Sequence, residues 1–262
     1  MTKELFMPKL TDEQIRLVKD EERLDFLIRE NRYVIQNPNY FPFSVDAVLL
    51  ANFITFNQRS SSSRIMDFCT GGGIIPLLLS HRTDAKIQAI ELQADIADMA
   101  KRSVRLNGLE EQIEIIQGDL RQLKANNQRL DVISCNPPYF SLNEAAKLHS
   151  NPYHAIARHE IHLTLDEWVS KASQLLKQKG RLFIVYRPNR LDDLMMSLLN
   201  HHFAIKRLCF VHPKQAENAN SVLVEAIARG GRQGVRVEPA IIVHQEDGSY
   251  TPMMQEIYYG NH

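Results

Sequence analysis

The fold is decided by the stretch Arg64-Ile65-Met66-Asp67-Phe68-Cys69-Thr70-Gly71-Gly72-Gly73-Ile74-Ile75-Pro76-Leu77-Leu78-Leu79-Ser80. Its first five residues have the pattern of a strand, the glycines predict a turn, and the apolar run after them predicts a buried helix. Pro76 is tolerated only in the first turn of that helix. A second strand, Lys86 to Glu91, follows. Strand, helix and strand in this order predict a parallel sheet with right-handed crossovers.

The alternation continues along the chain, which makes this an α/β protein. We expect helices at 94–107, 165–179 and 191–199, and strands at 113–119, 130–135, 181–186, 203–211, 221–229 and 240–244. Asn107 and Gly108 form a C-cap pair for the first of these helices. Because no long helix separates the last three strands, the sheet is expected to finish antiparallel.

Length and composition describe an ordinary globular protein. The chain has 262 residues, 44% of them hydrophobic and 24% charged, and its net charge is zero. A neutral chain does not bind nucleic acid by bulk electrostatics, although one basic face would suffice for phosphate contacts. With no apolar run of membrane length and no secretory signal pattern, we expect a cytoplasmic monomer that does not contact a membrane. Cys69, Cys135 and Cys209 are too far apart in sequence to suggest a zinc site or a disulfide framework.

The N-terminal segment differs from the rest. Residues 1–30 carry six basic and eight acidic residues and show broken apolar stripes with helical spacing. Arg32 to Gln36 has the pattern of a short edge strand, ended by Asn37-Pro38-Asn39. We therefore expect a helical and edge extension over residues 1–35, followed by a single larger domain over residues 36–262.

The glycine turn has the form Asp67-x-x-x-Gly71-x-Gly73-x-x-Pro76. It keeps two glycines of the dinucleotide fingerprint but has proline at the third position, which disfavours an NAD site. Glycines allow a ligand close to the backbone, and the helix that follows favours negative charge. A tight strand–helix turn without a ligand would also explain this pattern.

Four successive strands end on polar side chains, namely Asp67, Glu91, Asp119 and Asn136. In an open α/β sheet these ends lie at one edge, where ligands bind. Glu91 could accept hydrogen bonds from ribose hydroxyls, and Asp119, with Leu120 beside it, could accept from an adenine amino group. A solvated strand end would explain either acid alone, but four together favour one shared cleft.

The tetrapeptide Asn136-Pro137-Pro138-Tyr139 follows the fourth strand. Two consecutive prolines prevent a strand or helix from continuing, so these residues form a stiff loop. The loop offers an amide, free carbonyls and an aromatic ring. This combination suits a planar group that carries an amino group.

A helix follows the stretch Tyr40-Phe41-Pro42-Phe43-Ser44-Val45-Asp46. Ser44 is a suitable N-cap, and Asp46 lies in the first turn, where the helix dipole favours a carboxylate. A capped core helix explains both residues. Phe43 could instead line a ligand pocket.

These motifs resemble motifs one to four of class I S-adenosylmethionine-dependent methyltransferases. Asn-Pro-Pro-Tyr is typical of enzymes that methylate the 6-amino group of adenine or the amide of glutamine. The whole chain resembles the bacterial tRNA1(Val) adenine N6-methyltransferase family. The stretches that carry this closer resemblance are Glu22-Arg-Leu-Asp25, Tyr33-Val-Ile-Gln36, Phe41-x-Phe43-Ser-Val-Asp46-Ala-Val-Leu-Leu50, Ala157-Arg-His-Glu160, His212-Pro-Lys214 and Ala219-Asn-x-Val-Leu-Val224.

The resemblance implies a Rossmann-like class I methyltransferase with a mostly parallel seven-stranded sheet and helices on both faces, formed by residues 36–262. It implies S-adenosylmethionine as cofactor, S-adenosylhomocysteine as product, tRNA as partner and no metal. The implied catalytic residues are Asn136, Pro137, Pro138 and Tyr139. The implied cofactor-binding residues are Phe43, Asp67, Gly71, Gly73, Glu91, Asp119 and Leu120.

Residues 201–236 carry six basic and two acidic residues, which suits phosphate contacts. The candidate RNA-binding residues come from this basic segment and from the stretch Ala157-Arg-His-Glu160 that resembles the family. They are Arg158, Lys214, Arg229, Arg232 and Arg236. A merely solvated basic loop is the alternative. His149, His154, His159 and His162 have no regular metal spacing.

Three other functions remain open. Glutamine methylation of a protein such as a release factor would require a peptide groove and no basic segment. A DNA adenine methyltransferase would normally carry a target-recognition domain, for which the chain has no room. A non-catalytic module that binds cofactor or RNA would not need the Asn136–Tyr139 loop.

Overall fold

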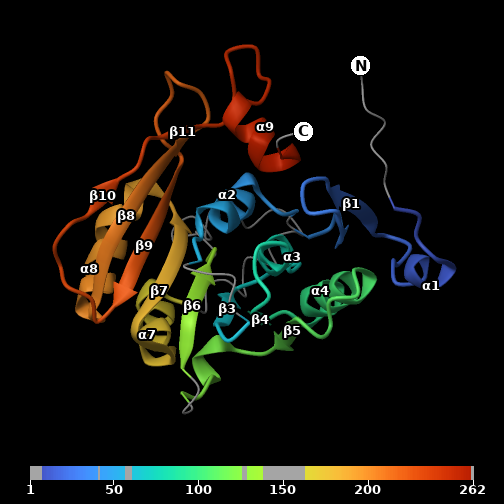
Figure 1. Cartoon of the computed structure of the whole chain (residues 1–262), viewed down its shortest axis with the longest axis horizontal. Helices are drawn as coiled ribbons and strands as arrows, with labels where there is room; N and C mark the ends of the chain where they lie inside the picture. The colour runs from blue at the N-terminus through green and yellow to red at the C-terminus, as the bar shows by residue number, and fades with distance from the viewer. Residues whose placement is uncertain (1–7, 41, 57–60, 126–128, 138–162, 261–262) are drawn as a thin grey trace, which may run out of the picture.

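A nine-stranded sheet forms the centre of the computed structural model, which describes residues 8–40, 42–56, 61–125, 129–137 and 163–260 (Figure 1). Its strand order is β10-β8-β9-β7-β6-β3-β4-β5, and β11 also pairs with β8. The strands are β3 (Arg64–Phe68), β4 (Lys86–Glu91), β5 (Ile113–Gln117), β6 (Leu130–Cys135), β7 (Leu176–Tyr186), β8 (Phe203–His212), β9 (Ser221–Ala228), β10 (Arg236–Val237) and β11 (Ile241–Ile242).

The sheet is mostly parallel, as the alternation of strands and helices predicts. Strands β5, β4, β3, β6 and β7 are parallel to their neighbours, whereas β9 runs antiparallel between β7 and β8. The expected antiparallel finish is therefore confirmed for β9. The strand expected at 240–244 is reduced to the two residues of β11, which pairs parallel with β8, and the two-residue β10 is an addition beside it, so the sheet has nine strands where seven were expected.

Helices cover both faces of the sheet (Figure 1). One apolar cluster joins α2 (Val45–Phe53), α3 (Ile74–Ser80), α4 (Ala94–Leu106) and α9 (Pro252–Tyr259) to one face. A second cluster joins α7 (Leu165–Leu175) and α8 (Leu191–Asn200) to the other. Six of the seven residues of α3 are buried, which explains its unbroken apolar sequence. Two short 3-10 turns, η1 (Leu120–Gln122) and η2 (Pro188–Arg190), follow β5 and β7.

The boundary between α7 and β7 differs from the prediction. The helix ends at Leu175 rather than at Lys179, and Leu176 already pairs with Leu130 of β6. A Cβ at Gly180 would lie 3.0 Å from the Lys177 carbonyl oxygen and 3.2 Å from that of Leu130. Glycine at this position therefore permits a close backbone approach inside a strand instead of ending a helix.

The helical interpretation of the N-terminal segment is wrong over residues 23–27. Only α1 (Asp12–Ile15) is helical among the described residues before 36, while β1 (Arg23–Leu27) and β2 (Arg32–Gln36) form an antiparallel hairpin. Phe26 lies opposite Tyr33, with ring centroids 4.8 Å apart. Cross-strand packing thus overrides the helical spacing of the apolar residues. The division of the chain near residue 36 stays a prediction.

Side chains of α4 and its C-cap form hydrogen bonds with backbone groups of β2 that no third strand among the described residues pairs with. The Asn107 amide accepts from the Tyr33 backbone N–H at 2.9 Å and donates to the Tyr33 carbonyl oxygen at 2.6 Å. Ser103 Oγ accepts from the backbone N–H of Ile35 at 3.0 Å. Ile35 is fully buried in a small cluster with Met99 and other apolar residues. The hairpin is thereby fixed to the main domain.

Replacing Asn107 with alanine should lower the free energy of unfolding by about 2 kcal/mol, because two backbone groups of Tyr33 would lose their partners. The measurement is urea unfolding followed by circular dichroism. Asn218→Ala, a change at an exposed loop position, serves as the control and should have little effect. Equal stability of the two variants would contradict this account of how the hairpin is held.

Candidate active site

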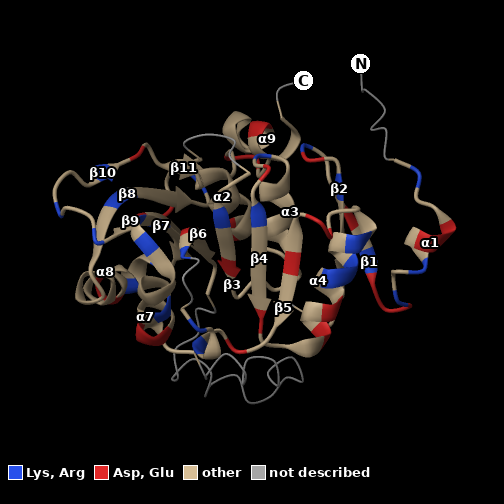
Figure 2. Cartoon of the chain, turned by 60° about the horizontal axis from the view of Figure 1, so that its bottom comes forward, with Lys and Arg blue, Asp and Glu red and all other residues tan. Residues whose placement is uncertain are grey.

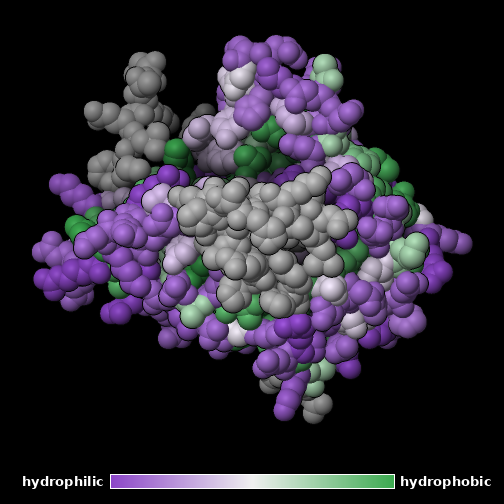
Figure 3. All heavy atoms as spheres, turned by 180° about the vertical axis from the view of Figure 1, so that it is seen from behind, coloured by the Kyte–Doolittle hydropathy of each residue, from purple (hydrophilic) through white to green (hydrophobic). Residues whose placement is uncertain are grey.

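A cavity of about 430 Å³ lies at the carboxyl edge of the parallel strands. Its lining comes from the glycine turn after β3, the ends of β4, β6 and β7, the segment after β5, and the start of α2. Figure 3 shows a hollow with an apolar floor on this side of the molecule. In Figure 2 acidic residues lie toward the carboxyl ends of β3 and β4. Glu91, Asp119 and Asn136 share this cavity as expected, but the fourth strand-end residue, Asp67, does not line it.

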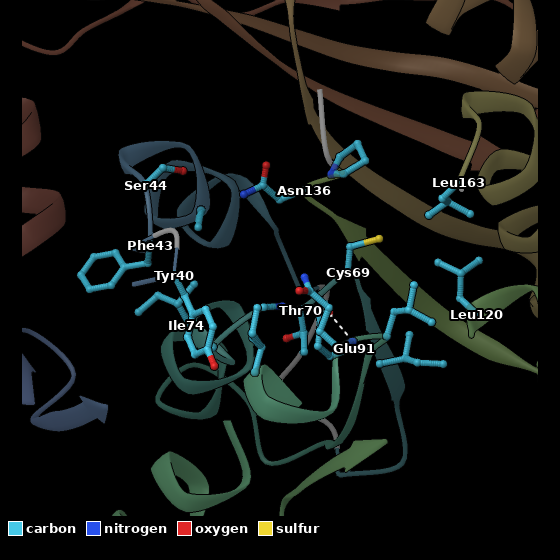
Figure 4. Close-up of a pocket in the computed structure, with 18 of the residues that line it drawn as sticks. Tyr40, Phe43, Ser44, Cys69, Thr70, Ile74, Glu91, Leu120, Asn136 and Leu163 are labelled. Atoms are coloured by element: carbon cyan, nitrogen blue, oxygen red, sulfur yellow. Dashed lines mark hydrogen bonds between the residues drawn. The ribbon is translucent and has the colours of Figure 1, made fainter. Parts of the chain in front are cut away.

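Glu91 ties the glycine turn to the start of α4. Its Oε2 accepts from the Gly71 N–H and its Oε1 from the Gln93 N–H, both at 2.9 Å. Burial raises the pKa of Glu91, and these backbone hydrogen bonds act in the opposite direction. The carboxylate lines the cavity, with the turn residues around it (Figure 4). Glu91 can therefore both hold the turn and accept further hydrogen bonds from a ligand.

Gly71 and Gly73 have different functions. Gly71 has a φ of +55°, lines the cavity, and would present a Cβ to open space. Gly73 has a φ of +80° and does not line the cavity. A Cβ at this position would lie 3.3 Å from Ala100 Cβ in α4. Gly71 thus leaves room for a ligand, whereas Gly73 allows α3 to start close against α4.

Asp67 lies behind the cavity instead of lining it. Its side chain is fully buried at the end of β3, where Oδ1 accepts from the Ser134 hydroxyl at 2.6 Å. Oδ2 has no hydrogen-bond partner among the described residues. Burial raises the pKa of Asp67 to about 7, although the Ser134 hydrogen bond favours the ionised form. A cofactor would contact this carboxyl only through the turn.

Asp119 is held by Arg121, which sequence reasoning missed. The Arg121 Nη2 donates to Asp119 Oδ2 at 2.6 Å, and the Arg121 backbone N–H donates to Oδ1 at 2.9 Å. These contacts lower the pKa of Asp119 despite its partial burial. Asp119, Arg121 and the buried Leu120 between them all line the cavity. One wall of the cavity is therefore an ion pair next to an apolar side chain.

The opposite part of the cavity is formed by Asn136, Pro137 and the start of α2. In Figure 4 the Asn136 amide points toward the side where Ser44 and Phe43 lie. Ser44 is the N-cap residue of α2, but its side chain makes no capping hydrogen bond. Phe43 donates its backbone N–H to Gln36 Oε1 at 3.1 Å and lines the cavity, as one interpretation of the sequence expected. Pro138, Tyr139 and Arg158 lie outside the described residues.

The candidate RNA-binding residues do not share one edge. Lys214 follows the carboxyl end of β8, on the cavity side, and donates to the Glu246 carbonyl oxygen at 3.0 Å. Arg229 follows β9 at the opposite edge, because β9 runs antiparallel, and donates to the Ser173 carbonyl oxygen. Arg232 is exposed beyond it, and Arg236 begins β10 and pairs with Glu238. The structure brings only Lys214 toward the cavity.

Arg187 is a second lining residue that sequence reasoning missed. It follows the predicted strand ending at Tyr186, so the rule that identified Glu91 and Asn136 would also have identified it.

Among the described residues, no helix is long and apolar enough to cross a membrane, and no group of three or more His, Cys, Asp or Glu side chains could hold a metal ion.

Comparison with known proteins agrees with this geometry. The family model of the methyltransferase small domain matches residues 44–208. A Porphyromonas gingivalis protein named tRNA1(Val) (adenine(37)-N6)-methyltransferase is 30% identical, over 79% of this chain and 83% of that protein. A Vibrio parahaemolyticus protein of the same name is 28% identical over the same shares. The solved structure of a predicted O-methyltransferase from Agrobacterium tumefaciens superposes with a TM-score of 0.63 at 22% identity, covering 82% of this chain and 96% of that one.

The fold and the cavity are those of a class I methyltransferase. The chain belongs to the methyltransferase small domain family and, within it, to the family of tRNA1(Val) (adenine(37)-N6)-methyltransferases. The expectations of a Rossmann-like enzyme and of S-adenosylmethionine as cofactor are thereby confirmed. The open cradle at Gly71, the buried carboxylate of Glu91 and the apolar wall at Leu120 fit an adenosine-bearing cofactor.

The raised pKa of Asp67 predicts a pH-dependent stability. Its pKa rises on folding from 3.8 to about 7, so the native state binds this proton more tightly than the unfolded state does. The free energy of unfolding should therefore fall as pH rises from about 4 to about 7, by up to about 4 kcal/mol.

Asp67→Asn removes the titrating group and keeps an acceptor for Ser134. The cofactor-free wild type and this variant should be unfolded with urea at several pH values between 4 and 8. The stability of the wild type should decrease relative to that of the variant across this range. A constant difference between the two proteins would show that Asp67 has an ordinary pKa.

Proposed function

We propose that this enzyme methylates the 6-amino group of an adenine in tRNA, namely the anticodon-loop adenine next to the anticodon of tRNA1(Val). The observation that carries the proposal is that Asn136 and Pro137 line the same cavity as Glu91. The names of the relatives support the choice of substrate.

S-adenosylmethionine supplies a methyl group activated by its sulfonium centre. In our proposal Glu91 accepts hydrogen bonds from the ribose hydroxyls, and Leu120 packs against the adenine. Asp119 accepts from the adenine amino group, because a carboxylate paired with Arg121 keeps acceptor capacity. Gly71 allows the backbone close to the methionine portion, where Phe43 also lies. Asp67 and Gly73 support the turn from behind.

The target base is held by the Asn136–Tyr139 loop. The Asn136 Oδ1 and the Pro137 carbonyl oxygen accept from the two N–H groups of the adenine 6-amino group, which aims its nitrogen lone pair at the methyl group. Positioning supplies most of the acceleration, so no strong general base is needed, and the proton leaves to water. Pro138 stiffens the loop, and Tyr139 stacks on the base after it has left its own stack.

The tRNA would also contact basic residues outside the cavity. Lys214, at the cavity edge, and Arg158 are the candidates for phosphate contacts near the target. Arg229, Arg232 and Arg236 lie away from the cavity and would contact a more distant part of a tRNA. A glutamine side chain also presents an NH₂ group to Asn136, so methylation of a release factor is the competing activity.

The substrate class can be tested by parallel methyl transfer from labelled S-adenosylmethionine to total tRNA, total DNA and a release factor. The proposal expects label in N6-methyladenosine after digestion of the tRNA to nucleosides. Label only in protein would move the target to glutamine, and label only in DNA would move it to a DNA base. Cofactor binding without any transfer would favour a non-catalytic module.

Asn136→Ala should reduce kcat/KM for tRNA by at least about 100-fold, since it removes an acceptor that aims the reacting amine. The Kd for S-adenosylhomocysteine, measured by calorimetry, should change little. Asn200→Ala, at the exposed end of α8, is the matched control. If the Asn136 variant kept the activity of this control, Asn136 would have no part in the reaction.

A further inference from the structure

Arg187 lies at the carboxyl end of β7 and lines the cavity beside Asn136. Its Nη1 donates to the Asn220 carbonyl oxygen at 2.9 Å and to Ser221 Oγ at 3.3 Å. Its Nη2 lies 3.8 Å from Asp46 Oδ2, a long distance for an ion pair. The side chain remains 39% exposed. These neighbours orient the guanidinium, and the partly exposed side chain lines the cavity.

The position of Arg187 relative to Asn136 follows from the sheet register. Cys135 of β6 pairs with Ile184 of β7, so Asn136 is level with the residue after Ile184, and Arg187 lies further along. Strand spacing and rise place the two Cα atoms about 8 Å apart. Such a separation suits a nucleotide, whose exocyclic amine and phosphate lie at opposite ends.

The charges around the cavity differ between its two ends. Arg121 is occupied by Asp119 at the end that receives the cofactor. At the target end, Asp46 Oδ1 accepts from the Ser221 hydroxyl at 2.7 Å, which satisfies one of its oxygens without Arg187. Arg187 is therefore a cation at the target end, and its carboxylate neighbour Asp46 is also held by the Ser221 hydroxyl. A planar guanidinium is well suited to a phosphate.

We propose that Arg187 binds a backbone phosphate adjacent to the target adenosine and so selects a nucleic acid over a glutamine side chain. This inference rests on the proposed function, because the phosphate belongs to the RNA substrate. Arg187 acts by positioning the extruded nucleotide so that its 6-amino group reaches Asn136. Extrusion of a base turns its flanking phosphates, and a fixed cation at the cavity mouth stabilises that geometry.

The alternative is that Arg187 only links β7 to α2 and to the start of β9. A structural link would make the fold more stable but would not depend on the charge of the RNA. The two possibilities therefore differ in the salt dependence of RNA binding. Loss of one phosphate contact reduces the slope of log Kd against log salt by about one.

The test compares Arg187→Gln, Arg187→Lys and Arg190→Gln with the wild type. Arg190 lies in η2 on the same segment, has a 33% exposed side chain and pairs with Asp193, but it does not line the cavity. Binding of an anticodon stem–loop RNA is measured by fluorescence anisotropy over a range of salt concentrations. Calorimetry with S-adenosylhomocysteine serves as the folding control.

Arg187→Gln should weaken RNA binding by about 10- to 100-fold and reduce the salt slope by about one, with cofactor binding unchanged. Arg187→Lys should keep the slope, and Arg190→Gln should behave as the wild type. An unchanged slope in Arg187→Gln would overturn the proposal. So would equal losses in the Arg187 and Arg190 variants.

Neutral linkages identify the phosphate without relying on a stable variant. A methylphosphonate placed either 5′ or 3′ to the target adenosine should weaken binding to the wild type by at least about 10-fold at one of the two positions. In the Arg187→Gln variant the same methylphosphonate should reduce RNA affinity little further, because this variant already lacks the contact with the phosphate. Full affinity of the wild type for both modified RNAs would overturn the proposal. Absence of any methylation of unmodified tRNA by the wild type would instead contradict the proposed function.

Discussion

The buried carboxylate of Glu91 is the contact on which the site depends. It accepts one backbone N–H from the glycine turn after β3 and one from the turn after β4. Loss of this acceptor would leave two N–H groups without a partner at the edge of the sheet, and buried donors of that kind are costly. The same carboxylate lines the cavity. One side chain therefore fixes both the shape of the turn and the polar end of the cofactor site.

The three acids at this edge have different environments. Burial raises the pKa of Asp67 and of Glu91, whereas Arg121 lowers that of Asp119. Asp67 lies behind the turn and accepts a hydrogen bond from Ser134 of the neighbouring strand, which connects β3 to β6. Ser134 is two residues before Asn136 in the sequence. The position of the loop that begins at Asn136 is thus linked to the position of the glycine turn. The two parts of the cavity, at the glycine turn and at Asn136, therefore share one rigid support.

The part of the cavity at Arg187 and Asp46 depends on contacts between segments far apart in the chain. Ser221, at the start of β9, donates to Asp46 in the first turn of α2. Arg187 binds the same two residues from the end of β7. The antiparallel direction of β9 places its first residue at the carboxyl edge of β7, beside the cavity. The finish of the sheet therefore shapes the entrance to the site.

The sequence by itself determined most of the central sheet and the position of the cavity. Period-two and period-3.6 patterns are local, and polar residues after successive parallel strands must meet at one edge. Glu91, Asp119 and Asn136 could be found in this way, and Arg187 follows the same rule.

Tertiary structure decided what local patterns do not encode. The apolar spacing of residues 23–28 suits a helix, but pairing with β2 and docking on Asn107 made residues 23–27 a strand. Arg229 belongs to a basic segment, yet the direction of β9 places it away from the cavity. Arg121 and Asp119 are two residues apart, but only the turn at η1 brings their charges together. In each case the deciding interaction involves the path of the backbone in space, which composition and periodicity do not specify.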